Sequence, residues 1–241
     1  MRVIVCDSYE EMSKEAAKIV AGQVYVKPDS ILGLATGSTP VGMYEELVKL
    51  YSAKQIDFKD VKTFNLDEYY PISKENDQSY HYFMHDNLFN GINVAPENIH
   101  ILNGEAKDPE KECENYDKMI DEAGGIDLQI LGIGRNGHIA FNEPDDALVA
   151  STHVTGLTDD TIDANARFFA SKDDVPTKAL TMGIASILKS KKIIILANGA
   201  SKRDAVRKLL DDEITTSVPA TMLKVHKDVI LICDKDAYGE N

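Results

Sequence analysis

The first segment with possible chemistry runs from Thr36 to Pro40 and follows an apolar stretch. Gly37 permits a sharp turn, Ser38 and Thr39 supply hydroxyl groups, and Pro40 suits the first turn of a helix. Backbone N–H groups exposed at a helix start can bind phosphate. The residues fit a phosphate-binding turn and an ordinary capped turn equally well, and both interpretations remain open at this point.

A second segment, Asn65–Tyr69, places two adjacent acids, Asp67 and Glu68, after another apolar stretch. Acids at the end of a strand are usually solvated. The alternative is a carboxylate held at the mouth of a sheet, where it could act as a general base. Spacing alone does not decide between these two interpretations.

The third segment, Gly132–Gly137, matches the dinucleotide-binding pattern G-x-G-x-x-G. That pattern needs a helix to follow, and Pro144 would interrupt a helix within two turns, so we reject a nucleotide site. What remains is a glycine-bent loop that presents Asn136, His138 and Glu143. A lone histidine is more often structural, but an imidazole with a carboxylate five residues later could be an oriented acid or base.

Other polar residues give weaker signals. His81 and His85 have the spacing of a helical zinc site, but Tyr82 replaces the expected glutamate and no third ligand is apparent, so we predict no metal. Lys202 follows an apolar stretch at a predicted helix start, which is a good place for an anion. Arg167 is a second candidate cation, although either residue alone would be read as a surface charge.

The elements that must position these residues alternate between short apolar stretches and longer helical patterns. The predicted strands are Val3–Val5, Ile31–Ala35, Val61–Leu66, Ile99–Leu102, Ile126–Ile133, Lys192–Ala197 and Val229–Cys233. Beyond a first helix that Ser8 and Glu11 would cap, the predicted helices are about Val41–Leu50, Tyr80–Phe89, Pro109–Ala123, Lys178–Leu188 and Lys202–Leu210.

This alternation predicts an α/β fold, namely a doubly wound, mostly parallel, Rossmann-like sheet with helices on both faces. With no repeat, low-complexity tract or Pro/Gly-rich linker in the sequence, we predict a single domain over residues 1–241. Ligands bind such sheets outside the carboxyl ends of the strands. The three segments described above follow predicted strands at those ends.

Composition narrows the possible partners and compartment. The 241 residues carry 26 basic and 40 acidic side chains, a net charge of −14, which argues against sequence-independent binding to nucleic acid. The three cysteines contain no Cys-x-x-Cys pair, which is typical of reduced thiols. Neither a signal-peptide core nor a membrane-spanning stretch is present. We therefore expect a cytoplasmic protein with no membrane or nucleic-acid partner.

Taken together, these segments resemble the glucosamine-6-phosphate deaminases over nearly the whole chain. The resemblance rests on LGLATGSTPVGMY, FNLDEYY, SYHYFM, GIGRNGHIAFNEP, NARFF, VPTKALTMGI and SVPATML, in that order. Sugar-phosphate lactonases share the fold but typically have Thr-Ala-Ser-Leu-Phe-Pro after the Gly-His pair. Sugar-responsive transcription regulators also share the fold, and they add a helix-turn-helix for which this sequence has no room.

The resemblance implies conversion of glucosamine 6-phosphate and water to fructose 6-phosphate and ammonium, with no metal or other cofactor. His138 would open the sugar ring, and Glu143 and Asn136 would orient and polarise its imidazole. Asp67 would move a proton from C2 to C1. Alternatives on the same fold are a 6-phosphogluconolactonase-like hydrolase and a non-catalytic sugar-phosphate sensor, although a sensor would be expected to lose these acid/base residues.

In the same resemblance, the substrate phosphate would contact Gly37, Ser38 and Thr39 together with Arg167 and Lys202. One departure is Asn136, where many family members have aspartate.

The resemblance also bears on regulation. In the regulated, hexameric members, a Ser, an Arg and a Lys hold the phosphate of N-acetylglucosamine 6-phosphate, and these positions are Asp146, His153 and Thr155 here. An acid therefore replaces a neutral contact, and two cations are lost. We expect no activation by that effector, and a monomer or small homo-oligomer instead of an allosteric hexamer.

Overall fold

A seven-stranded parallel sheet forms the centre of the computed structural model, which describes residues 1–165, 169, 171 and 174–239. In spatial order its strands are β1 (Arg2–Cys6), β10 (Val229–Asp234), β9 (Lys192–Ala197), β6 (Leu128–Gly132), β2 (Ile31–Leu34), β3 (Lys62–Asn65) and β5 (Ile99–His100). The central strands are apolar because both of their faces are covered; Ile193, Ile194 and Ile195, for example, have no exposed surface.

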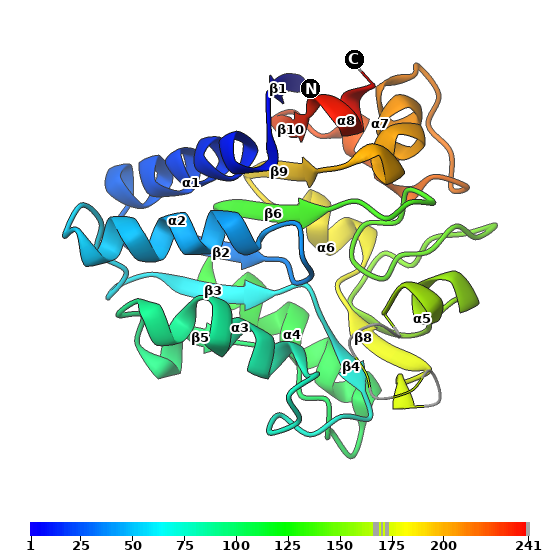
Figure 1. Ribbon diagram of the computed structural model, residues 1–241. Coiled ribbons are helices and arrows are strands. Elements are labelled where there is room, and N and C mark those ends of the chain that lie inside the picture. Colours follow the sequence, from blue (N-terminus) through cyan, green and yellow to red (C-terminus); the bar gives the residue numbers. More distant parts are fainter. Residues whose placement is uncertain (166–168, 170, 172–173, 240–241) are drawn as a thin grey trace.

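Helices cover both faces of this sheet. Figure 1 shows α1, α2 and α3 in front of the strands and α4 and α6 behind them. The α-helices are α1 (Tyr9–Val26), α2 (Val41–Ser52), α3 (Tyr80–Asn87), α4 (Pro109–Ala123), α5 (Asp159–Asn165), α6 (Ile184–Leu188), α7 (Arg203–Leu210) and α8 (Lys235–Tyr238). Short 3-10 helices are η1 (Phe89–Gly91), η2 (Pro96–Asn98), η5 (Ala200–Lys202) and η6 (Pro219–Val225). The predicted doubly wound, mostly parallel fold is confirmed.

A second, three-stranded antiparallel sheet lies beyond the carboxyl end of β3. Its order is β4 (Asp67–Tyr70), β8 (Lys178–Thr181) and β7 (His153–Gly156), with Asp67 paired to Thr181. Only Leu66 separates β3 from β4, and its carbonyl accepts a 2.8 Å hydrogen bond from the N–H of Met182. The chain therefore passes directly from the large sheet into the small one at Asp67.

Several predicted elements agree with the structure. Strand Lys192–Ala197 and helix Pro109–Ala123 match residue for residue. Ser8 does cap α1, accepting from the N–H of Glu11 at 3.2 Å, whereas the Glu11 carboxylate accepts from Asp7 and not from Ser8. None of the helices in the described part of the chain combines the length and apolarity that crossing a membrane requires.

One predicted helix is wrong. The stretch Lys178–Leu188 forms strand β8 and then the short helix α6, with Gly183 between them. The cause is pairing with distant strands, since β8 hydrogen-bonds to β4 on one side and β7 on the other. A Cβ at Gly183 would also lie 2.1 Å from the carbonyl oxygen of Ser151, so the chain needs a residue without a side chain there.

Candidate active site

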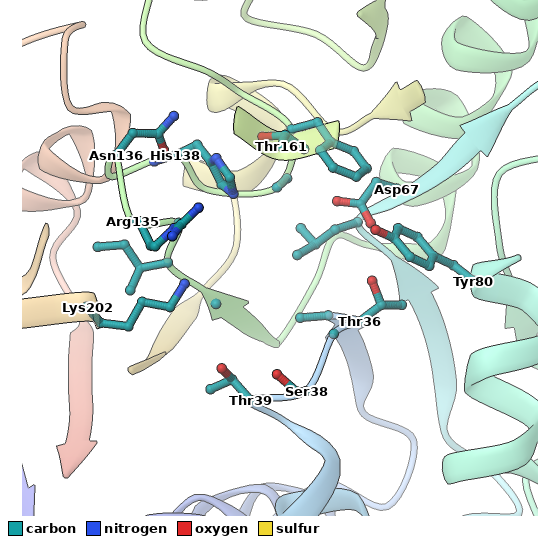
Figure 2. Close-up of a pocket in the computed structure, with 18 residues that line it drawn as sticks. Thr36, Ser38, Thr39, Asp67, Tyr80, Arg135, Asn136, His138, Thr161 and Lys202 are labelled. Atoms are coloured by element: carbon teal, nitrogen blue, oxygen red, sulfur yellow. Dashed lines mark hydrogen bonds between the residues drawn. The ribbon is translucent and has the colours of Figure 1, made fainter. Parts of the chain in front are cut away.

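A cavity of about 220 Å³ opens at the carboxyl ends of the central strands, as predicted for this fold (Figure 2). Its lining comes from the turn after β2, the start of β4, the loop after β6, and one residue each from α3, α5 and η5. Asp67 lies on one side of the cavity, and Lys202 lies on the other (Figure 2).

The turn after β2 forms one end of the cavity and is held by distant side chains. Gly37 has φ +90°, a conformation that favours glycine. The Tyr9 hydroxyl donates to the Ser38 carbonyl at 3.1 Å and accepts from the N–H of Gly42 at 2.8 Å. Thr39 donates to the Asn198 side chain at 2.7 Å, which ties this turn to the segment after β9. The turn is thus fixed before any ligand binds.

Lys202 ends η5, and its ammonium group points into the cavity near Ser38 and Thr39 (Figure 2). The structure therefore brings four of the five predicted phosphate contacts into the lining of one cavity: Gly37, Ser38, Thr39 and Lys202. The fifth, Arg167, lies outside the described residues. A helix start, hydroxyl groups and a cation at one place suit an anion.

The loop after β6 is a tight turn that supports the histidine. The N–H of Gly137 donates to the carbonyl of Gly134 at 3.0 Å, and Gly137 has φ +87°. A Cβ at Gly134 would lie about 2.5 Å from three atoms of the His138 ring, so the imidazole packs directly on that glycine. Beyond the turn, Ile139 bridges to Asn142 instead of continuing as a helix, which agrees with the rejection of a nucleotide site.

Glu143 is the anionic partner of His138. Its Oε1 lies 3.0 Å from Nδ1 of His138, although the direction of this contact falls outside that of a hydrogen bond. The same carboxylate accepts from Asn136 Nδ2 at 2.7 Å and from the Thr161 hydroxyl. Burial acts to raise the pKa of Glu143, but contacts from His138, Thr161 and Asn136 outweigh it and lower the pKa. Glu143 is therefore a carboxylate whose negative charge faces the imidazole of His138.

Asn136 acts on this pair indirectly. Its Oδ1 accepts from the backbone N–H of His138 at 3.1 Å, while its Nδ2 donates to Glu143. The resemblance implied that Asn136 orients and polarises the imidazole directly, but its contacts are to the His138 backbone and to the Glu143 carboxylate. Asn136 thus holds the loop and the anion that face the imidazole.

Asp67 is the first residue of β4, and its carboxyl group reaches the cavity beside Tyr80 (Figure 2). It is 6% exposed and Glu68 is 2% exposed, so the interpretation of these acids as solvated is wrong. Burial and the neighbouring charge of Glu68 raise the pKa of Asp67 to about 8. The side chain makes no hydrogen bond to the residues that the structure describes. A carboxyl group that titrates near neutral pH suits general acid/base work.

Three polar residues of the cavity lining were not singled out from the sequence: Tyr80, Arg135 and Thr161. Tyr80 and Thr161 line the cavity from α3 and α5, and Tyr80 stacks on Phe141 with ring centroids 6.1 Å apart. Arg135 points into the cavity between His138 and Lys202 (Figure 2). Position within the SYHYFM and GIGRNG motifs was the available signal for Tyr80 and Arg135. Thr161 gave none, because it reaches Glu143 from a separate helix.

The two histidines considered for zinc lie away from this cavity lining. The rings of His81 and His85 have centroids 4.6 Å apart on α3. Across the described residues, no group of three or more His, Cys, Asp or Glu side chains is placed to hold a metal ion.

Known proteins give a consistent picture. The family model for glucosamine-6-phosphate isomerases/6-phosphogluconolactonase matches residues 7–231. A glucosamine-6-phosphate deaminase of Clostridioides difficile (strain 630) is 60% identical over 240 residues, which is 100% of this chain and 96% of the relative. A glucosamine-6-phosphate deaminase of Clostridium botulinum (strain Langeland) is 56% identical, covering 100% of this chain and 98% of the relative.

Solved structures agree with these sequence relatives. One described as a monomeric glucosamine-6-phosphate deaminase is 47% identical, with a TM-score of 0.98 and 100% of both chains covered. A 6-phosphogluconolactonase from Trypanosoma brucei, 18% identical with a TM-score of 0.79 over 99% of this chain and 97% of the other, shows the shared fold alone. The chain belongs to the glucosamine-6-phosphate isomerase/6-phosphogluconolactonase family.

Proposed function

We propose that this chain is a glucosamine-6-phosphate deaminase, which converts glucosamine 6-phosphate and water to fructose 6-phosphate and ammonium. The observation that carries the proposal is the division of one cavity into an anion-binding end and two acid/base groups, His138 and Asp67. Ring opening and proton transfer between carbons need two such groups at different atoms of one sugar. Relatives of 56–60% identity that cover the whole chain support the same activity.

Ring opening falls to His138 in this proposal. The imidazole takes the proton of the C1 hydroxyl and delivers a proton to the ring oxygen, which breaks the bond between C1 and that oxygen and leaves an open-chain aldehyde. The imidazole carries positive charge between these two transfers. Glu143 stabilises that charge because its carboxylate lies 3.0 Å from Nδ1 of the ring.

Proton transfer between carbons then falls to Asp67. As a carboxylate it removes the proton from C2 while the C1 oxygen takes a proton from solvent, which gives an enolamine. Returning the first proton to C1 forms a protonated ketimine at C2. Water adds to C2 of the ketimine. The bond between C2 and the nitrogen then breaks, which releases ammonia and leaves fructose 6-phosphate. A pKa of about 8 lets Asp67 both accept and return a proton near neutral pH.

The phosphate of the substrate would bind Gly37, Ser38, Thr39 and Lys202, and Arg167 is carried over from its motif. Among the described residues of the cavity lining, Asp67 is the one acid and Arg135 and Lys202 are the cations. The cavity is therefore polarised although the chain carries a net charge of −14. A phosphate at the cationic end would leave C1 and C2 toward His138 and Asp67.

Three further features of the chain are part of the proposal. We infer that residues 1–241 act as a single domain, in the cytoplasm, and without a partner beyond the sugar phosphate. A monomer or small homo-oligomer is supported by the solved relative that is described as monomeric. A reaction made only of proton transfers, hydration and C–N cleavage also needs no redox cofactor.

The test is an ammonia-release assay on glucosamine 6-phosphate, with unphosphorylated glucosamine as the control. We expect ammonium and fructose 6-phosphate in equal amounts from the phosphorylated sugar and almost none from glucosamine. Hydrolysis of 6-phosphogluconolactone without ammonia release would contradict the proposal and favour the lactonase alternative.

A further inference from the structure

Next to Asp67 lies a second buried carboxyl group, Glu68, which the reaction described above does not use. It is 2% exposed, and it accepts three backbone hydrogen bonds of 2.9 Å each. The donors are the N–H groups of Tyr69, Tyr80 and His81. Three backbone donors, with no cation paired to Glu68 among the described residues, make a site suited to a carboxylate.

Two of these donors belong to the first turn of α3, which begins at Tyr80. The first N–H groups of a helix have no partner within the helix, and negative charge is stabilised at that end. Ser79 satisfies the N–H of Tyr82 at 3.0 Å, and Glu68 satisfies those of Tyr80 and His81 from β4. Glu68 therefore fastens the start of α3 to the strand that carries Asp67.

That attachment places a cavity residue. Tyr80 contributes both the N–H that Glu68 accepts and a ring that lines the cavity beside Asp67 (Figure 2). The Tyr80 ring packs on Tyr69 of β4, with centroids 4.7 Å apart. Without the Glu68 carboxylate, Tyr80 would therefore lose this attachment to β4, and its ring would no longer be held beside Asp67.

The two adjacent carboxyl groups have unequal surroundings. Glu68 has three N–H donors that favour its anion, whereas Asp67 has no hydrogen bond to a described residue. Burial raises the pKa of Glu68 to about 7 against the effect of those donors, and that of Asp67 to about 8. The three N–H donors favour ionisation of Glu68 over that of Asp67, and the charge of Glu68 then disfavours a second anion next to it.

Other groups around Asp67 do not supply this charge. Tyr44 of α2, Tyr80 of α3 and Tyr116 of α4 all have their pKa raised by burial above the ordinary value, so they are neutral near pH 7. Tyr69, next along β4, is neutral for the same reason. Arg135 and Lys202 line the same cavity, and their positive charge would act in the opposite direction to that of Glu68, as would His138 when it carries a proton.

We propose that Glu68 is a positioning residue of the reaction, an anionic cap that holds α3 and Tyr80 against β4 and whose charge opposes ionisation of the Asp67 carboxyl. The inference rests on the proposed function for the role of Asp67. Glu68 itself makes no contact with the substrate.

The first experiment is Glu68→Gln, which keeps the side-chain volume and one acceptor oxygen but removes the charge. Asp67 then ionises more easily, so the acid limb of the kcat/KM profile for glucosamine 6-phosphate should move to lower pH by about half a unit or more. Asp67 also becomes a weaker base, so kcat on the alkaline plateau should fall. Carbon-13 NMR of the labelled Asp67 carboxyl should show its titration moving in the same direction.

Two matched variants separate charge from packing. Ser79→Ala removes another cap of the same helix without changing charge, so it should lower Tm and leave the acid limb in place. Glu68→Asp keeps the charge on a shorter side chain, so it should also lower Tm while keeping the acid limb near its native position. Glu68→Asp keeps the inference testable if Glu68→Gln does not fold.

The outcomes are distinct. An unmoved acid limb and an unmoved Asp67 titration in Glu68→Gln would overturn the inference, as would an equal movement of the limb in Ser79→Ala. Should the native enzyme release no ammonia, the proposed function fails. The NMR titration would still decide whether Glu68 controls the ionisation of Asp67.

Discussion

Each candidate catalytic side chain is held by a neighbour that does not itself react. His138 rests on Gly134 and faces Glu143, and Asp67 lies next to Glu68. The motifs in the sequence were enough to predict which residue types would meet at the strand ends. Burial of Asp67 was not predictable in this way, since adjacent acids after a strand are usually solvated and only the strand pairing of β4 covers them.

The raised pKa of Asp67 predicts opposite effects of Asp67→Asn on activity and stability. Loss of the base should lower turnover by about 10²–10⁴-fold. Between about pH 4 and pH 8, the folded protein retains a proton on Asp67 that the unfolded chain releases, so the native stability falls as pH rises through this window. Asparagine does not titrate, and the variant should therefore melt at a higher temperature than the native protein at pH 8.

Thermal melts at pH 4 and pH 8, together with the ammonia assay, check this prediction. The gain in Tm should be small at pH 4, where Asp67 is protonated in both states, and should grow toward pH 8. Asp146→Asn, at an exposed acid, serves as the control and should change neither quantity. A lower Tm for Asp67→Asn than for the native protein at pH 8 would show that the buried Asp67 carboxyl does not destabilise the folded state.

Elements were predictable where local pattern and tertiary pairing agree. Apolar stretches predicted the buried central strands, and the helical pattern with its cap predicted helix α4. The small sheet was not predictable, because β4, β8 and β7 lie far apart in sequence and are each four residues long. Such strands are stabilised by one another, and the helical periodicity of Lys178–Leu188 gave no sign of that pairing. Because the small sheet was not predicted, the position of Asp67 at the start of β4 was not predicted either.

In the loop after β6, the position of the His138 ring requires a residue without a side chain at Gly134. In Gly134→Ala, the new Cβ would lie about 2.5 Å from three ring atoms, so the imidazole must leave its position beside Glu143. A displacement near 1 Å can cost about 10²-fold in rate, and we expect kcat to fall toward that extent with little change in the fold.

The matched control is Gly156→Ala at the end of β7, where an added Cβ meets nothing within 4 Å. Steady-state kinetics and circular dichroism on both variants check the prediction. Equal kcat values for the two variants would mean that the imidazole position does not depend on Gly134.

Across the whole molecule, the net negative charge of the chain contrasts with the mostly positive charges of the cavity lining. The described lining of the cavity has two cations and one acid, so a sugar phosphate meets local attraction although the chain has a net charge of −14. The sequence could predict this polarity only in outline, because Arg135 and Lys202 are far apart in the chain and are brought to one cavity by β6 and β9. Regulation by a second sugar phosphate would require another cationic site of this kind.

The last prediction is that N-acetylglucosamine 6-phosphate does not activate this enzyme. The three positions that hold the effector phosphate in regulated relatives, according to the resemblance, are Asp146, His153 and Thr155. Asp146 is exposed, Nδ1 of His153 lies 2.9 Å from the Ser151 carbonyl, and Thr155 donates to Gly156 at 3.3 Å. An exposed carboxylate repels a phosphate dianion, and no fixed cation replaces the missing ones at these three positions.

Initial rates against glucosamine 6-phosphate, with and without the acetylated sugar phosphate, measure this directly. Both curves should be hyperbolic and superimposable at low effector concentration, with simple competition as the one effect at high concentration. Light scattering during gel filtration should give a mass near the 26.6 kDa of one chain or a small multiple of it. A sigmoidal curve that the effector makes hyperbolic would contradict the prediction. Such behaviour requires coupled substrate sites and an effector that binds one state of the enzyme better than the other.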